Sequence, residues 1–181
     1  MGEGKKPMMV VEALPRYEPE VGRFLWMLEE TRRRTQECLE GVNAVVLDWT
    51  PDPTANSISA LLYHIAAIEA DWLFEEVLEA QTFPADLVAL FPEDVRDETG
   101  RLVTARGTSL ATSLDWLDAV RGHVVAAFRE MSLAEFRRVR DFPDYSVTPE
   151  WVLYHLIQHE AEHQGQIGLL RDLAERATGG S

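Results

Sequence analysis

A long helix is predicted near the C-terminus, from Thr148 to about Arg176. Thr148, Pro149 and Glu150 supply a capping hydroxyl, a fixed φ at the first helical position and a carboxylate at the positive end of the helix dipole. A four-residue step departs from a full helical turn by only about 40°. The histidines that recur at this step therefore share one face with apolar residues, and this face is predicted to turn toward the core: His155, His159 and His163.

Three earlier segments carry apolar residues at three- and four-residue steps, which predicts further helices at about 20–39, 58–80 and 109–131. Ser57 and Ser109 are expected to cap the second and the third of these helices. The chain has 181 residues, of which 46% are hydrophobic, and this is enough for one domain with a substantial core. We therefore expect a single all-α domain.

The connection between residues 81 and 107 shows no helical period, and Pro84 and Pro92 break the pattern. Connections this long are uncommon inside compact domains. The segment is predicted to be either a functional lid or a crossover between parallel helices.

The charge balance argues against polyanionic partners. Seventeen Lys and Arg residues stand against 31 Asp and Glu residues, a formal net charge of -14, which repels phosphate backbones and anionic membrane surfaces. The single cysteine, Cys38, cannot form an internal disulfide, and the apolar run at 8–11 is too short for a signal segment. We expect a cytoplasmic protein that binds neither nucleic acid nor membranes.

The core-facing histidines point to a metal site. Each unsatisfied buried ring nitrogen costs about 1–3 kcal/mol, and either a metal or hydrogen bonds to Tyr154, Gln158 or one another would satisfy them. His155 and His163 lie about 12 Å apart along the helix axis, so only one i, i+4 pair can bind a given ion. The pair is either 155/159 or 159/163, and His64 is the best candidate for a third ligand. Such a site leaves one or two positions open, and it suits zinc, nickel or ferrous iron.

The segment His159-Glu160-Ala161-Glu162-His163 also fits H-E-x-x-H, the metallopeptidase signature in which the glutamate is the general base. The extended signature and a convincing downstream acidic ligand are both missing. Glu160 and Glu162 point to opposite sides of the histidine stripe. A supporting or solvated role is therefore predicted for them rather than a catalytic one.

Two further groups of polar residues are given structural interpretations. Arg32, Arg33 and Arg34 could hold an acidic ligand, but three arginines on the polar side of a helix more often form a solvated face. His123 flanks the apolar stripe of the third predicted helix, where a lone histidine is more often structural than a ligand.

Two blocks of this sequence resemble the DinB/YfiT-like metalloenzyme superfamily: Ser57–Trp72, which contains His64, and Trp151–Ile167, which ends in His163-Gln-Gly-Gln-Ile167. The resemblance extends from about Val21 to Arg176. It implies a single four-helix bundle domain at residues 18–177, in which one connection is a long crossover, after a loose tail at residues 1–17. Such bundles are often dimeric. It also implies one divalent ion held by His64, His159 and His163.

By the same resemblance, His155 lines the pocket without binding the ion. Glu160, Asp71 and Gln166 join it as residues expected to line the pocket or to support the ligands. No residue is assigned as catalytic.

The leading functional hypothesis is a metal-dependent enzyme that activates a low-molecular-weight thiol for transfer to a small electrophilic substrate. Relatives implied by the resemblance include bacillithiol and mycothiol S-transferases, so either thiol is a candidate cosubstrate. A metal-dependent hydrolase is the first alternative, in which the ion activates water. A non-catalytic metal-binding stress-response or binding module is the second.

The opposite side of the last predicted helix carries a second stripe of small and apolar residues: Tyr154, Ile157, Ala161, Gly165 and Gly168. Glycine inside a helix costs about 0.5–1 kcal/mol relative to alanine, so the close approach of another helix would explain it. That helix belongs either to the same bundle or to the partner in a homodimer.

Overall fold

The computed structural model describes residues 8–91, 95–96, 98, 101–103 and 106–179. The all-α prediction is confirmed, since the described strands form only one small antiparallel sheet, β1 (Arg140–Asp141) with β2 (Ser146–Val147). The helices, in chain order, are α1 (Pro19–Cys38), α2 (Ala44–Leu47), α3 (Ile58–Asp71), the π-helix η1 (Trp72–Val77), α4 (Ala85–Leu90), α5 (Leu110–Phe128), α6 (Leu133–Phe136) and α7 (Pro149–Thr178).

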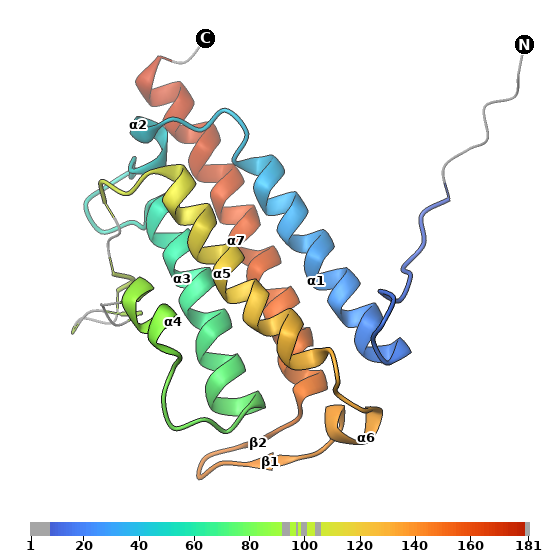
Figure 1. Ribbon diagram of the computed structural model, residues 1–181. Coiled ribbons are helices and arrows are strands. Elements are labelled where there is room, and N and C mark those ends of the chain that lie inside the picture. Colours follow the sequence, from blue (N-terminus) through green and yellow to red (C-terminus); the bar gives the residue numbers. More distant parts are fainter. Residues whose placement is uncertain (1–7, 92–94, 97, 99–100, 104–105, 180–181) are drawn as a thin grey trace, which may run out of the picture.

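Four long helices form the bundle. α1 and α7 run in one direction, and α3 and α5 run in the opposite direction (Figure 1). α1 packs against α7, and α3 packs against both α5 and α7. The metal ligands expected on α3 and α7 therefore come from neighbouring antiparallel helices.

The helix starts follow the local capping residues. Ser57, Ser109 and Thr148 each accept a hydrogen bond from a backbone N–H in the first turn of the helix that follows, as predicted. The second predicted helix does not continue unchanged to residue 80, because α3 gives way at Trp72 to the π-helix η1. Wider π turns often occur at functional sites.

The segment after η1 is a crossover, because α3 and α5 run the same way (Figure 1). The expectation that it has no helical structure is wrong for Ala85–Leu90, which forms α4 around the fully buried Leu87. His123 Nε2 lies 3.0 Å from Asp86 Oδ2, so this histidine joins α5 to α4. Pro92 lies outside the described residues.

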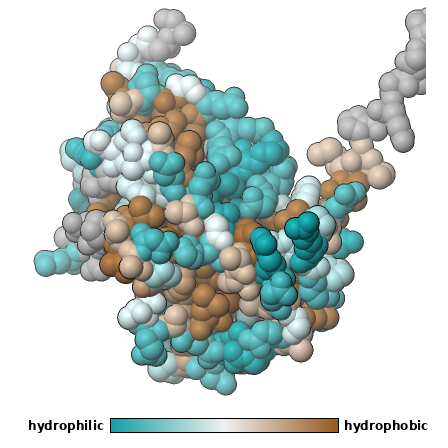
Figure 2. Space-filling model, viewed as in Figure 1, coloured by the Kyte–Doolittle hydropathy of each residue, from teal (hydrophilic) through white to brown (hydrophobic). Residues whose placement is uncertain are grey.

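The core is built from apolar side chains on the inner faces of the long helices. Fully buried examples are Leu25, Leu28, Leu61, Leu62, Ile65, Leu117, Val120, Val124 and Leu153. The outer surface of α1 is hydrophilic (Figure 2), and Arg33 and Arg34 pair there with Glu30. In the described part of the chain, no helix combines the length and the apolar character that crossing a membrane requires.

Arg32 departs from the prediction of a solvated arginine face. It is buried, with 3% of its surface exposed, and it pairs with Glu69 at 2.8 Å and with Glu160 at 2.7 Å. Arg121 pairs with the same two carboxylates, at 2.6 Å and 3.1 Å. Each of the four long helices thus contributes one charged residue to a closed ring of buried ion pairs.

In the segment that precedes α1, the residues nearest the helix pack against the bundle. Leu14 N donates a hydrogen bond to Gly22 O at 3.2 Å, and Tyr17 packs against the core. A Cβ atom at Gly22 would lie 2.9 Å from Leu14 O, so this crossing requires glycine. Residues 1–7 of the predicted tail lie outside the described residues.

Candidate metal centre

Three histidines converge between α3 and α7. His64 comes from the middle of α3, while His159 and His163 lie on consecutive turns of α7. His159 Nε2 is 3.0 Å from His64 Nε2 and 3.1 Å from His163 Nε2, and the three nitrogens all lie within 4.8 Å of one another. Tetrahedral zinc bound by three nitrogens at about 2.0–2.1 Å would hold them roughly 3.4 Å apart. The group could therefore hold a metal ion after only small adjustments.

Hydrogen bonds alone do not satisfy this group. Gln166 Oε1 lies 3.1 Å from His163 Nδ1, and because a carbonyl oxygen only accepts, the proton of a neutral His163 is on Nδ1 and its Nε2 carries a lone pair. His159 Nε2 has a single site, either a proton or a lone pair, yet it faces two nitrogens. A cation would accept all three lone pairs, so the donor set fits a metal.

Burial keeps these imidazoles neutral. Desolvation, reinforced by the charge of His163, lowers the pKa of His64 to about 4. Desolvation and the neighbouring histidines lower the pKa of His159 to about 3, and desolvation also lowers the pKa of His163. Neutral imidazole is the form that binds metals. Near pH 7 the three rings are therefore ready to act as ligands.

His155 lies outside the converging group. Its ring stacks on Trp151 with centroids 5.1 Å apart and planes 8° apart, and Trp72 packs against it at 4.7 Å. The ring of His159 is 5.9 Å away. Of the two pairs left open by spacing, the structure thus brings 159/163 together with His64, and it places His155 between the metal centre and two tryptophans.

Gln166 and Asp71, which were predicted to line the pocket or to support the ligands, lie in different places. Gln166 is exposed and orients His163 through the contact at Nδ1. Asp71 is half-buried at the last position of α3 and is engaged by an interaction within the chain. Neither residue belongs to the histidine group itself.

The side chain of Glu160 does not belong to the histidine group. Its carboxylate is almost fully buried, at 1% exposure, and is held by Arg32 Nε at 2.7 Å and by Arg121 Nη2 at 3.1 Å. Both of its carboxylate oxygens accept hydrogen bonds from these guanidinium groups. The peptidase interpretation of H-E-x-x-H therefore lacks its general base, while Glu162 is exposed and accepts from Gln158.

Comparison with known proteins decides the family. The sequence matches the DinB superfamily over residues 27–167. The chain belongs to the DinB superfamily. A search of curated proteins returned no match.

A solved structure supports the fold of this DinB protein. It is the crystal structure of a conserved protein from Enterococcus faecalis, which is 20% identical in sequence, with a TM-score of 0.62, and the match covers 82% of this chain and 92% of the other. At this level of identity the likeness concerns the fold alone. The DinB fold and the three-histidine group are thus compatible with a metal-binding enzyme.

Sequence reasoning missed three features of this DinB site. Arg96, in the crossover, lies near enough to His64 and His163 for its charge to lower their pKa, and no local pattern signals it. Glu69, a carboxylate inside a mostly apolar helix, is a visible signal of the buried ion pairs. Trp151 stands four residues before His155, so it belongs to the same stripe and could have been found.

Proposed function

We propose that this protein is a divalent-metal-dependent enzyme in which His64, His159 and His163 hold one ion and present a low-molecular-weight thiol to an electrophilic substrate. The observation that carries the proposal is the convergence of three imidazole Nε2 atoms that hydrogen bonds alone leave unsatisfied. When bound, the ion supplies the positive charge that deprotonates a coordinated thiol. Zinc suits three imidazoles, and nickel or iron would also fit.

The exposure of the ligands supports an open site. His64 is buried, whereas His159 and His163 are half-buried, so one side of the group is accessible to small molecules. Three protein ligands leave one or two positions for a substrate, as in catalytic rather than structural sites. The charge of Arg96 near the histidines would attract an anionic group on the substrate or thiol.

The choice of a thiol over water rests on the position of Glu160. Hydrolysis by a metal-bound water is assisted by a base that accepts its proton. The glutamate that the H-E-x-x-H pattern would assign to this task is held by Arg32 and Arg121. A coordinated thiol would lose its proton to solvent without such a base, because thiols are more acidic than water and coordination by a metal favours the thiolate. Bacillithiol and mycothiol are the cosubstrates suggested by related enzymes.

Metal content tests the ligand set. Purified protein should contain about one equivalent of a divalent metal by elemental analysis, and His64→Ala, His159→Ala and His163→Ala should each lose most of it. His155→Ala is the matched control, because it removes an imidazole from the same stripe outside the converging group. Retention of metal in His163→Ala, with loss in His155→Ala, would overturn the assignment.

A thermal-shift screen of the metal-loaded protein tests the nucleophile. Bacillithiol or mycothiol should raise the melting temperature of the native protein but not that of His159→Ala, with glutathione as the comparison thiol. No response to any thiol, together with release of product from an ester or amide library, would favour the hydrolase. Metal binding without a response to thiols or substrates would favour a non-catalytic binding module.

We also propose that the protein is a homodimer that uses the outer face of α7. Ala161 and Gly165 are exposed, and a Cβ atom added at Gly165 or Gly168 would meet nothing within 4 Å. The open space beside both glycines supports a helix of a second copy as the partner of this stripe.

A further inference from the structure

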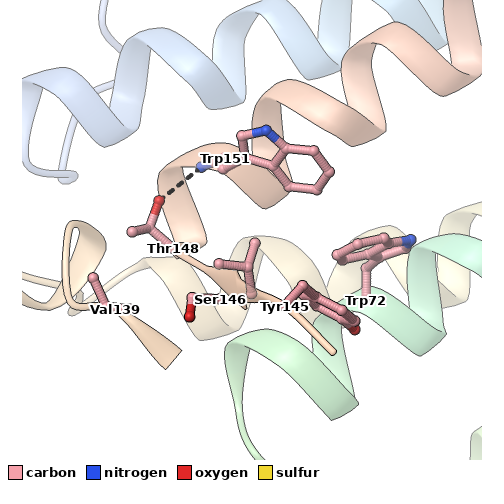
Figure 3. Close-up of a pocket in the computed structure, with 7 residues that line it drawn as sticks. Trp72, Val139, Tyr145, Ser146, Thr148 and Trp151 are labelled. Atoms are coloured by element: carbon pink, nitrogen blue, oxygen red, sulfur yellow. Dashed lines mark hydrogen bonds between the residues drawn. The ribbon is translucent and has the colours of Figure 1, made fainter. Parts of the chain in front are cut away.

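A pocket lies at the end of the bundle where η1, the β1–β2 hairpin and the start of α7 meet (Figure 3). Its volume is about 450 Å³, and it is lined by Trp72, Val139, Tyr145, Ser146, Val147, Thr148 and Trp151. Small-molecule sites typically have volumes of about 300–1,000 Å³. The pocket is therefore large enough for a substituent of two or three rings.

The side-chain hydroxyls around this pocket are already engaged within the protein. Tyr145 donates to Glu76 Oε1 at 2.6 Å, and Ser146 donates to Asp141 Oδ1 at 2.6 Å. Thr148 Oγ1 accepts from the backbone N–H of Trp151 at 3.2 Å (Figure 3). The rest of the lining side chains are indoles and valines, so an uncharged apolar group would lose little on entering.

The aromatic walls are held in place before any ligand arrives. The rings of Trp72 and Trp151 contact each other with centroids 5.3 Å apart, and Trp72 lies 6.3 Å from Tyr145. The ring of Phe142 stacks on that of Tyr145, with centroids 5.4 Å apart, and the buried Glu76 holds the hydroxyl of Tyr145 by a hydrogen bond. Preorganised aromatic faces favour flat rings, which gain from offset or edge-to-face contacts.

His155 connects this pocket to the metal centre. Both tryptophans contact its ring, at 4.7 Å and 5.1 Å, and its other neighbour is His159 at 5.9 Å. Two ring contacts thus separate a pocket wall from a proposed metal ligand. A molecule of two or three linked rings is long enough to cover the distance set by these two contacts.

We infer that the tryptophan pocket, defined by Trp72, Tyr145 and Trp151, binds a flat, uncharged aromatic group of the substrate while the reactive end of the same molecule reaches the histidine centre. This inference rests on the proposed metal-dependent function. It assigns the substrate class as an electrophile that carries an aryl substituent.

Binding of the neutral fluorescent probe N-phenyl-1-naphthylamine to the full-length protein tests the pocket. We expect saturable binding that does not need metal, with Trp151→Ala raising the dissociation constant about tenfold because an aromatic wall is lost. Val139→Arg, at an exposed position of the lining, should weaken binding similarly without disturbing the core. Tyr154→Ala is the matched control, since this exposed aromatic residue of α7 lies outside the pocket.

Three outcomes would overturn the inference: no saturable binding, equal affinities in Trp151→Ala, Val139→Arg and Tyr154→Ala, or tighter binding of tetraethylammonium than of the probe. The position relative to the histidines is tested by NMR of the bound probe with Co²⁺-loaded protein. Probe signals should broaden with native protein but not with His159→Ala, and absence of broadening in protein that holds both Co²⁺ and probe would also overturn it.

The same measurements separate this inference from the proposed function. If the protein holds no metal but binds the probe in a Trp151-dependent way, the metal-dependent function fails and the pocket stands as an aromatic binding site. If the three histidines hold metal but the probe does not bind, the aromatic substrate class fails and the metal centre stands.

Discussion

His159 is the residue on which the histidine group depends, because its Nε2 faces both of the other imidazoles. The next residue, Glu160, turns about 100° around the helix and enters the buried ion pairs instead. Neighbouring positions on one helix therefore serve different purposes. His159 is a proposed metal ligand, and Glu160 joins α7 to α1 and α5 through buried ion pairs.

Acid should destabilise the metal-free protein. The ordinary pKa of histidine is 6.5, and that of folded His64 is about 4, so below about pH 6.5 the unfolded chain takes up protons that the folded protein excludes. The free energy of unfolding should fall as the pH drops from about 6.5 toward 4, by at most roughly 1.4 kcal/mol per pH unit for each such histidine. Urea unfolding of protein treated with a chelator, measured between pH 7.5 and 4.5, gives this slope.

The control for this slope removes one of the three imidazoles. His64→Gln should reduce the dependence on pH, because one group with a lowered pKa is gone. The same slope in His64→Gln as in the native protein would contradict the explanation.

Glu160→Gln should destabilise the protein without removing its metal. The substitution removes one of the two carboxylates that neutralise the buried Arg32 and Arg121. Breaking a buried ion pair lowers the free energy of unfolding by about 3–5 kcal/mol. Denaturant unfolding should show this loss, whereas Glu162→Gln, at an exposed neighbouring position, should have no measurable effect. A fall in activity with unchanged stability would instead assign Glu160 to the chemistry.

At the scale of helices, α7 presents three different faces. One face carries His159 and His163 toward α3, a second carries buried residues such as Glu160 and Leu153 into the core, and the third exposes Ala161 and Gly165. The cap at Thr148 fixes where these faces begin. A shift of one residue along α7 would exchange their roles.

Gly165→Leu should convert a dimer into monomers without unfolding them. Outside the neighbouring backbone of α7, a Cβ at this position would meet no atom of the described chain within 4 Å. A leucine should therefore be tolerated in the monomer and would gain about 0.5–1 kcal/mol of helix propensity. Sedimentation should show the change in mass. Gly122→Leu, at a similarly open glycine of α5, should leave the association unchanged; unchanged sedimentation of Gly165→Leu would show that this face makes no contact between copies.

The long helices could be predicted because their signals are local. Ser57, Ser109 and Thr148 cap helices whose apolar periods are visible in the sequence. The burial of Arg32 could not be predicted in this way, because its partners Glu69 and Glu160 are 37 and 128 residues away. A triple-arginine run gives the same pattern whether one of its members is buried or all are exposed.

The histidine centre was partly predictable for the same reason. Helix geometry limits the pair on α7 to two choices, since both are i, i+4 pairs. Which pair meets His64 depends on how far α3 and α7 are shifted relative to each other, and this shift is set by packing across the whole bundle. The tryptophan pocket also depends on the hairpin, whose position no local pattern of residues encodes.

At the scale of the molecule, the ring of buried ion pairs and the histidine centre lie on adjacent residues of α7 and share α3. A metal that binds only the folded protein stabilises it by mass action, by about 2.7 kcal/mol when its free concentration is a hundred times the dissociation constant. The metal centre should therefore contribute to the stability of the whole bundle.

Removal of metal should lower the melting temperature of the native protein. Differential scanning calorimetry with and without a chelator measures the change, and re-addition of Zn²⁺ should reverse it. His159→Ala should melt at the same temperature under both conditions. An equal effect of the chelator on His159→Ala and on the native protein would place the metal elsewhere.

The pairing of α1 with α7 has a consequence for how the chain folds during synthesis. The apolar face of α1 is complete early, but its main partner begins only at Pro149. Contacts between residues so far apart in sequence form slowly, so the apolar face of α1 stays uncovered by α7 until α7 has been synthesised. Because His159 and His163 lie on α7, the histidine group can form only after this helix has been synthesised and has packed against α3, and the proposed metal would bind only after that step.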